Sequence, residues 1–288
     1  PPGVEEQLVL AESGDAPALY DHLRVGAYDA VFFVGLHSPV TYFGMRALAE
    51  GRRAFLVPGG HDAADVLSLH MATLARAERI LVCTEGERQR ILRAAGPGSS
   101  DRVDNVGFLT GVNTIVGPDA GGAGPGGFVV IARDWRSADS RGRHAPWAAA
   151  LARALPSGVE LRLVGPGAAG LPAGVPHTEA RIDAWWWMSR AIAVLDPEPH
   201  RVVGQETLEA LLYGVPVVVA DNGDASREHA EAGDGGLWFR VRDELVASIE
   251  RLLDDEVHRS LGEQGRSYAA RFADADTWVK RLAEVLLG

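Results

Sequence analysis

Lysine is nearly absent from this 288-residue sequence, whose only lysine is Lys280, close to the C-terminal end. A pyridoxal-phosphate enzyme needs a lysine for its Schiff base, and a P-loop NTPase needs the lysine of its G-K-[ST] motif. Cysteine is equally scarce, because Cys83 stands alone. A single cysteine forms no internal disulfide and no cysteine cluster for structural zinc. These shortages disfavour both enzyme classes, argue against a structural metal and fit a reducing cytoplasm.

Long apolar runs and an excess of positive charge are also missing. Nowhere do 18 apolar residues follow one another, and the first residues, PPGVEEQ, lack the basic and apolar blocks of a signal peptide. The 28 basic residues are outnumbered by 39 acidic ones, giving a net charge of −11. Nucleic-acid binding normally requires clustered basic surface. We therefore expect a cytoplasmic protein with no membrane-spanning segment and no nucleic-acid partner.

The first half of the sequence alternates short apolar runs with helix-like segments, which is typical of parallel βαβ units. The expected strands are 29–35, 53–62, 79–85 and 102–110, and the expected helices are 39–51, 63–77 and 86–96. A segment of almost only glycine, proline and alanine, GPDAGGAGPGG, follows at 117–127. Its composition predicts a linker. We therefore expect an N-terminal domain at 1–116.

The same alternation resumes after the linker and predicts a second domain at 128–272. Strands are expected at 127–135, 159–167, 192–198, 215–223 and 236–241, and helices at 146–155, 184–191 and 204–214. The tail shows apolar residues at helical spacing, and its last part, 273–288, is expected to pack back across the domains. Two such halves predict an α/β protein with two Rossmann-like, doubly wound parallel sheets. Ligands then bind beyond the carboxyl ends of the strands.

The segment 196–228 carries the clearest chemistry, because it joins a strand, a helix and a second strand. The start of the helix, from Gly204 through Gln205 and Glu206 to Thr207, offers backbone N–H groups and a positive dipole end that suit a diphosphate. One turn further, the Glu209 carboxylate is placed to accept hydrogen bonds from the hydroxyls of a sugar. Taken alone, Glu206 and Glu209 are more often solvated helix carboxylates.

This segment resembles the C-terminal signature of the retaining glycosyltransferases of the GT-B fold, family 4, P-S-x-x-E-G-F-G-x-x-x-L-E-A-x-x-x-G-x-P-V-V. The matching residues are Pro197, Gly204, Leu208-Glu209-Ala210, Gly214 and Pro216-Val217-Val218. The resemblance implies that Glu209 contacts the ribose of a nucleotide-sugar donor. The glutamate that contacts the donor sugar in this family is replaced by Arg201. That replacement fits an acidic sugar or acceptor, or lost activity.

Other loops add to the resemblance. The family's phosphate motif, G-R-x-x-x-x-K-G, corresponds to Arg133 and, three residues later than expected, to Arg141, which implies that both stabilise the leaving diphosphate. Gly60 and His61 match the position where a histidine of these enzymes touches the donor sugar. Gly165 resembles their short glycine turn beside the nucleotide. Three consecutive tryptophans, Trp185 to Trp187, suit an acceptor ring, although at least one of them is expected in the core.

The resemblance implies a bacterial, metal-independent enzyme that transfers a sugar, with retention, from a nucleotide diphosphate sugar. It needs no other cofactor, and the acceptor is a saccharide, a lipid or a secondary metabolite. A catalytically decayed GT-B binding protein and a GT-B nucleotide-sugar epimerase are the alternatives. The N-terminal half shows only three or four good strands, so the N-terminal GT-B domain is expected to be incomplete. The sequence leaves the sugar, the base and the oligomeric state open.

Overall fold

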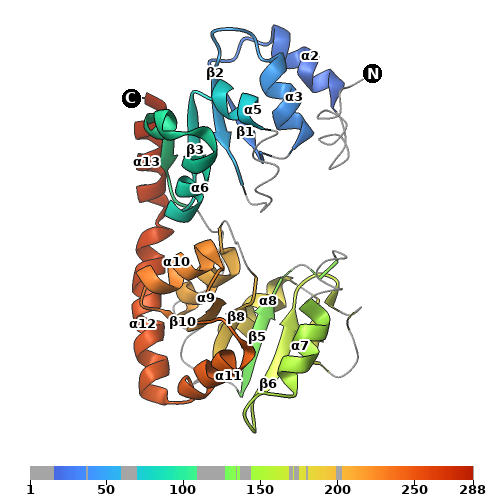
Figure 1. Ribbon diagram of the computed structural model, residues 1–288, viewed down its shortest axis with the longest axis vertical. Helices are drawn as coiled ribbons and strands as arrows, with labels where there is room; N and C mark the ends of the chain where they lie inside the picture. The colour runs from blue at the N-terminus through green and yellow to red at the C-terminus, as the bar shows by residue number, and fades with distance from the viewer. Residues whose placement is uncertain are drawn as a thin grey trace. The chain divides into compact units, whose positions relative to one another are not determined.

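The computed structural model describes residues 16–36, 38–59, 70–108, 127–133, 135–136, 144–168, 171, 175–179, 181–198 and 203–287. These residues form two compact α/β units (Figure 1). The first unit takes its described residues from 1–108, 203 and 275–287, and the second from 109–198 and 204–274. The expected linker, 117–127, lies outside the described residues except for its last position.

The first unit is built on a parallel sheet whose four described strands follow one another in chain order. They are β1 (Ala30–Val34), β2 (Arg53–Val57), β3 (Arg79–Val82) and β4 (Val103–Asn105). The described helices are α2 (Pro17–Val25), α3 (Pro39–Ala47), α5 (Met71–Arg76), α6 (Glu85–Ala95) and the 3₁₀ helix η1 (Pro97–Arg102). Parallel neighbours need helical crossovers, which explains the alternation in the sequence.

Helix α6 begins where its sequence predicts, because Thr84 caps it. The Thr84 hydroxyl accepts a hydrogen bond from the Glu87 backbone N–H at 3.1 Å, and the Glu87 carboxylate accepts one from the Cys83 backbone N–H at 2.7 Å. These two bonds satisfy N–H groups that the helix itself cannot pair. The Cys83 side chain is buried under this turn, and burial raises the pKa of its thiol to about 12.

The C-terminal helix α13 (Ala275–Leu287) belongs to the first unit although it follows the second in the chain. Its residues Leu282, Val285 and Leu286 pack against a small buried cluster of the sheet, formed by Phe55, Leu81 and Val106. Arg53 of β2 adds a hydrogen bond to the Leu286 carbonyl at 2.9 Å. The last segment of the chain therefore covers part of the first sheet. These contacts do not test the wider expectation that it packs across both domains.

The second unit contains a parallel sheet in the order β10-β9-β8-β5-β6-β7. The strands are β5 (Phe128–Ala132), β6 (Glu160–Val164), β7 (His177–Thr178), β8 (Ala193–Asp196), β9 (Val217–Ala220) and β10 (Gly236–Phe239). Its helices are α7 (Ala145–Ala152), α8 (Arg181–Met188), α9 (Gln205–Tyr213), α10 (Asp224–Ala232), α11 (Arg242–Arg251) and α12 (Asp255–Phe272). The order reverses at β5, so the chain leaves β5 and β8 in opposite directions. Such a switch point opens a crevice at the carboxyl ends of the strands.

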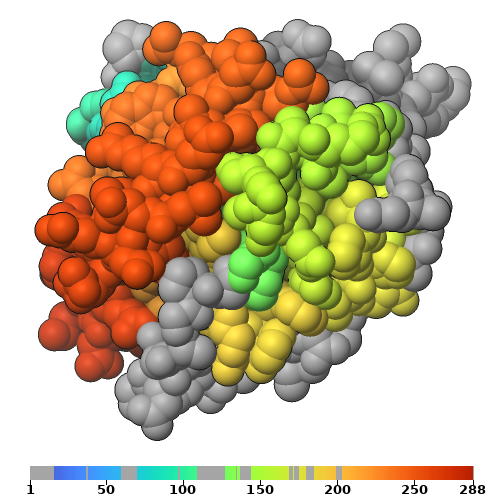
Figure 2. Space-filling view, turned by 90° about the horizontal axis from the view of Figure 1, so that it is seen from below, coloured from blue at the N-terminus to red at the C-terminus, as the bar shows by residue number. Residues whose placement is uncertain are grey.

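The core of the second unit lies between this sheet and the helices α7 and α11. Val129 and Ile131 of β5 are buried with Leu151 of α7 and Ile249 of α11. The ring of Trp147 on α7 stacks on that of Phe239 in β10. In Figure 2 the lime atoms of α7 adjoin the red-orange helical atoms that follow β10. This packing holds the strand ends at which the candidate site lies.

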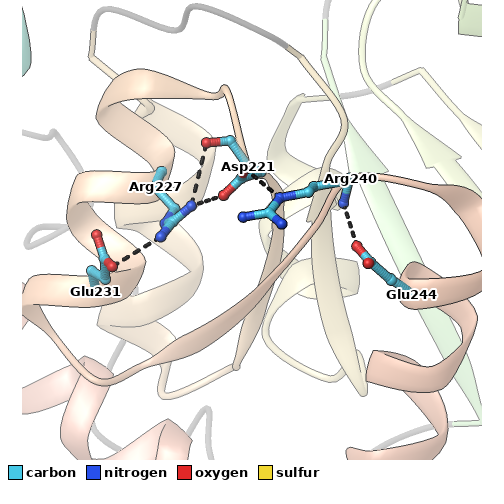
Figure 3. A network of polar contacts seen from close by, with 5 residues as sticks. All are labelled: Asp221, Arg227, Glu231, Arg240 and Glu244. Carbon is cyan, nitrogen blue, oxygen red and sulfur yellow. Dashed lines mark hydrogen bonds and ion pairs between the residues drawn. The ribbon is translucent and has the colours of Figure 1, made fainter.

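An ion-pair network ties the ends of β9 and β10 together (Figure 3). Asp221, just after β9, pairs with Arg227 of α10 and with Arg240, which follows β10. Glu231 pairs with Arg227 at 3.0 Å, and Glu244 accepts a hydrogen bond from the Arg240 backbone N–H at 2.7 Å. Partly exposed charges of this kind contribute modestly, because water screens them. The network fixes two loops away from the pocket described below.

The alternation of strands and helices expected from the sequence is confirmed over the described residues, while several boundaries differ. The expected strand at 102–110 is reduced to Val103–Asn105: the 3₁₀ helix includes Arg102, and residues 106–108 continue without strand pairing. The two-residue strand β7 and helix α2 were not expected. Strand β7 is too short to show any periodicity, and it owes its existence to pairing with β6.

Candidate functional site

A pocket of about 200 Å³ lies at the carboxyl ends of β5 and β6 and beside the start of α9, where the strand order reverses. Five of the residues expected to bind the donor contribute to its wall: Arg133, Gly165, Gln205, Glu206 and Glu209. The remaining lining residues are Ala132, Arg136, Val164, Pro166, Trp185 and Met188. The structure therefore brings charged side chains from the loop after β5 and from helix α9 together on one cavity of the second unit, and the loop after β6 contributes uncharged residues to its wall.

Arg133 follows β5 directly and is almost fully buried. Its Nη2 atom lies 2.6 Å from the Oε2 atom of Glu198, and 11% of its side chain is exposed. The guanidinium also lies near the ring of the buried Trp135, 5.6 Å from the ring centre. Its Nε and Nη1 atoms have no hydrogen-bond partner among the described residues. The arginine therefore brings a positive charge to the pocket wall, and two of its buried donor atoms are not engaged by the described residues.

Gly165 is fixed in the site by its backbone. It has φ +121°, a conformation that L side chains rarely adopt, and the Arg133 carbonyl oxygen occupies the space that a Cβ atom would need. The loops after β5 and β6 thus touch through their main chains. The glycine expected beside a nucleotide is required here for that contact, and it also lines the pocket.

Helix α9 begins at Gly204 in a left-handed conformation, with φ 60° and ψ 45°. Glycine suits this position because Ser226 is close: a Cβ atom on Gly204 would lie 2.9 Å from the Ser226 hydroxyl oxygen and 3.1 Å from its backbone nitrogen. The helix ends at Gly214, also left-handed, where the Val215 N–H donates to the Ala210 carbonyl. The two glycines bound the helix as the sequence predicts, and its N-terminal turn faces the pocket through Gln205 and Glu206.

Thr207 and Gly204, both expected to touch the donor, do not line the pocket. The Thr207 side chain is fully buried, and its hydroxyl donates to the Oδ2 atom of Asp196 at 3.4 Å. Asp196, at the end of β8, also accepts hydrogen bonds from the Ser226 hydroxyl at 2.5 Å and from the Glu198 backbone N–H at 3.2 Å. These two residues support the helix start instead of forming the wall.

Glu209 is a buried carboxylate one turn into α9. It is 4% exposed, and its Oε1 atom accepts a hydrogen bond from the Gln205 side-chain amide at 2.8 Å. Its charge acts on Tyr213, the next residue along the same helix face: burial and the Glu209 carboxylate together raise the pKa of the Tyr213 phenol. A buried acid on the pocket wall is suited to accept hydrogen bonds from hydroxyl groups of a ligand.

Arg136 was not singled out in the sequence, although it lines the pocket with Arg133. The spacing of the family motif directs attention to Arg141 instead. Arg136 lies three residues after Arg133 in the same loop, and that proximity was the signal that could have found it. The backbone and side chain of Arg136 lie within 3 Å of the space that a Cβ on Gly167 would occupy. The pocket wall thus holds two arginines and two glutamates.

The three tryptophans of α8 take different positions. Trp185 lines the pocket, Trp186 is 49% exposed, and Trp187 contacts Phe128 edge-on while the Arg162 guanidinium lies 3.7 Å from its ring centre. None of them is fully buried, so the expectation that at least one packs in the core is wrong. Arg162 of β6 lies over the Trp187 ring, and Arg190, just after α8, lies over the Trp186 ring.

Several expected site residues lie outside the described part of the chain: Gly60, His61, Arg141 and Arg201. Their roles stay predictions. Within the described residues, no group of three or more His, Cys, Asp or Glu side chains is placed to hold a metal ion. In the same part of the chain, no helix combines the length and apolar character needed to cross a membrane.

Comparison with known structures decides the fold. HepE from Anabaena, solved in complex with UDP-glucose, superposes with a TM-score of 0.71 at 18% sequence identity, covering 94% of this chain and 81% of HepE. The chain has the GT-B fold. No family model and no curated protein matches the sequence, so the GT-B fold is recognised by structure and by the motif residues rather than by overall sequence similarity.

Two further GT-B structures agree. Sucrose-phosphate synthase from Thermosynechococcus elongatus has a TM-score of 0.75 at 16% identity, covering 94% of this chain and 77% of its own. The lipopolysaccharide outer core galactosyltransferase WaaB, in its apo form, has a TM-score of 0.68 at 17% identity, with coverages of 94% and 78%. The predicted class, two Rossmann-like parallel-sheet domains of the GT-B type, is confirmed.

Proposed function

We propose that this chain is a glycosyltransferase that moves a sugar from a nucleotide diphosphate sugar to an acceptor hydroxyl, with retention of configuration. The observation that carries the proposal is the convergence of Arg133, Arg136 and the start of α9 with the buried Glu209 on one pocket. The pocket lies at the switch point of a Rossmann-like sheet, where nucleotides bind in doubly wound folds. The similarity to HepE, solved with UDP-glucose, supports the same ligand class.

In this proposal the diphosphate lies against Arg133, Arg136 and the N-terminal turn of α9. Breaking the bond between the sugar and the diphosphate leaves negative charge on the departing oxygen. Preorganised cations and helix N–H groups stabilise such charge in a site with little water. Arg141 remains a predicted further cation. These protein groups replace a divalent metal, so transfer is expected to persist in EDTA without any added cofactor.

The nucleoside occupies the rest of the pocket. The Glu209 carboxylate accepts hydrogen bonds from the ribose hydroxyls, held in place by Gln205. Val164, Pro166, Trp185 and Met188 supply an apolar wall for the base. His61, Gly60 and Arg201 are proposed to face the sugar, as the family resemblance implies. The acceptor is a saccharide, a lipid or a secondary metabolite, and we place the enzyme in a bacterial cytoplasm on the basis of its composition.

Calorimetric titration of the full chain with UDP, GDP and TDP tests the binding part of this proposal. One of the three is expected to bind, and Arg133→Ala is expected to weaken that binding by about 10- to 100-fold, since hydrogen bonds to charged groups contribute about 1.5–3 kcal/mol. Arg162→Ala is the matched control, because Arg162 lies over Trp187 in the same unit and does not line the pocket.

Turnover is tested separately with a panel of nucleotide sugars, with and without candidate acceptors, in EDTA. Release of the nucleoside diphosphate together with a glycoside of unchanged anomeric configuration by NMR is the expected result. An inverted product contradicts retention alone. Isomerised donor in the absence of an acceptor indicates an epimerase, and binding without turnover of any donor indicates a non-catalytic nucleotide-binding protein.

A further inference from the structure

A charge cluster lies directly behind Arg133. The Oε2 atom of Glu198 is 2.6 Å from Arg133 Nη2 and 3.2 Å from His144 Nε2. The three side chains come from the end of β5, the end of β8 and the start of α7, and each is less than one fifth exposed. The backbone N–H of Glu198 donates a hydrogen bond to the Asp196 carboxylate, which fixes the backbone from which the Glu198 side chain extends.

Arg133 belongs both to this cluster and to the wall of the pocket. Arg133 lines the pocket, whereas neither Glu198 nor His144 is among the described residues of its wall. The contact between Arg133 and Glu198 is a close approach of charges, and Glu198 Oε2 has no hydrogen-bond partner of good geometry among the described residues. Arg133 Nε and Nη1 are likewise unpaired there. The carboxylate thus compensates the charge of the arginine at Nη2 and leaves Nε and Nη1 without a hydrogen-bond partner among the described residues.

A buried cation needs a counter-charge, because leaving it unpaired costs several kcal/mol. Glu198 meets this need in the empty protein. A diphosphate that enters the pocket brings a second counter-charge to the same guanidinium. Its attraction to Arg133 is then opposed by repulsion from Glu198, which lies only one side chain away, at a distance where charges still interact strongly inside a protein.

We propose that Glu198 is the resident counter-ion of Arg133 and that it lowers the affinity of the pocket for a diphosphate. In the framework of the proposed function, on which this role rests, the group that leaves with each turnover is a nucleoside diphosphate. A site with an uncompensated buried arginine retains that product. Glu198 keeps the arginine in position and compensates its charge between turnovers, so that the product dissociates. It is a positioning residue, since it acts through Arg133.

Titration of the full chain with inorganic pyrophosphate, in EDTA, tests the counter-ion directly. Glu198→Gln keeps the size of the side chain and removes its charge, and it is expected to bind pyrophosphate about tenfold more tightly than the wild type. UDP is also expected to bind Glu198→Gln more tightly than the wild type, while uridine, which lacks phosphate, is expected to bind both proteins with equal affinity. A merely structural role predicts weaker or unchanged binding of all three.

Glu231→Gln is the control for the removal of a glutamate from an arginine pair. Glu231 lies 3.0 Å from Arg227, and neither residue lines the pocket (Figure 3). This substitution is expected to leave the pyrophosphate affinity unchanged. Without ligand, Glu198→Gln is expected to melt at a lower temperature than the wild type, and saturating pyrophosphate is expected to raise its melting temperature by more than it raises that of the wild type.

Glu198→Asp, which keeps the charge but moves it away from Arg133, tests the counter-ion role if Glu198→Gln does not fold. The Glu198→Asp protein is expected to bind pyrophosphate about threefold more tightly than the wild type.

The outcomes separate this inference from the proposed function. If the wild type binds a nucleoside diphosphate and neither Glu198 variant binds pyrophosphate more tightly, the counter-ion role is overturned and the nucleotide site stands. If no nucleoside diphosphate binds any of the proteins, the proposed function fails. Tighter pyrophosphate binding by Glu198→Gln supports the counter-ion role in that case too, because it depends only on the charge of Arg133.

Discussion

The backbone of Gly165 lies directly against that of Arg133: a Cβ atom on Gly165 would be 2.0 Å from the Arg133 carbonyl oxygen. This contact joins the loop after β6 to the loop after β5, and both residues line the pocket. The position of the arginine is therefore set by main-chain packing as well as by its ion pair with Glu198. A substitution of Gly165 is therefore expected to displace Arg133 without removing any charged group from the site.

Gly165→Ala is expected to destabilise the second unit and to weaken binding of a nucleoside diphosphate. Backbone strain at a positive φ contributes about 1–3 kcal/mol, and the steric overlap with the Arg133 carbonyl adds to it. Chemical denaturation measures the loss. Gly158→Ala is the matched control, because Gly158 has φ +85° and nothing within 4 Å of its Cβ position, so it reports strain alone. Equal losses in the two variants would contradict the close contact.

Glu209→Gln is expected to reduce discrimination between UDP and an analogue whose ribose lacks the 2′ and 3′ hydroxyls. In the wild type, the hydroxyls donate to a buried carboxylate, and losing such bonds is expected to cost about 10- to 100-fold in affinity, since each charged hydrogen bond contributes about 1.5–3 kcal/mol. Competition calorimetry with both nucleotides measures the ratio. If the ratio of the two affinities is the same in the wild type and in the variant, Glu209 does not bind the ribose hydroxyls.

Asp196→Ala is expected to lower the free energy of unfolding by about 2 kcal/mol or more, since it leaves two buried hydroxyls and one backbone N–H without their acceptor. Ser226→Ala removes a single one of these bonds and is expected to cost less. Because Asp196 holds both the Glu198 backbone and the first turn of α9, the affinity for a nucleoside diphosphate is expected to fall with stability. A stable Asp196→Ala protein contradicts the assignment.

The Cys83 thiol is expected to make the protein less stable at alkaline pH. Its pKa is about 12 in the folded protein, compared with 9.0 for an ordinary thiol. Between these values the unfolded chain loses the thiol proton while the folded chain keeps it, so the free energy of unfolding falls as pH rises above 9. Below pH 9 this thiol has no effect on the pH dependence. Urea denaturation from pH 8 to 11 is expected to show a steeper decline for the wild type than for Cys83→Ala.

The sequence predicted the elements and most of the pocket because both depend on local patterns. Apolar runs followed by helical spacing identified the strands, and the glycines at 204 and 214 bounded α9 correctly. Arg133 and Gly165 were found because they follow strands whose carboxyl ends must meet at one edge of a parallel sheet, and Glu209 was found because it lies one turn into the helix after β8. Local pattern and tertiary position agree for the residues that immediately follow β5 and β6.

The sequence did not predict contacts that depend on the fold in three dimensions. Thr207 has the right place in the chain, but the turn of the helix directs it to Asp196, so it supports the site from behind. The place of Glu198 in the sequence does not show that it lies next to Arg133, because that contact arises from the pairing of β5 with β8 in the sheet. Arg136 was missed because the motif spacing of distant relatives does not fix which arginine of a loop faces the cavity.

Helix α13 has a consequence for the order in which the protein folds during synthesis. Its residues Leu282, Val285 and Leu286 cover Phe55, Leu81 and Val106, which are made some two hundred residues earlier. Until the ribosome has released this helix, these three residues of the first unit lack the side chains that pack against them. The second unit has by then been synthesised through α12. Domains made first usually fold first. Here the first unit finishes last, so a chaperone that shields apolar surface is expected to bind the nascent chain through its N-terminal sheet.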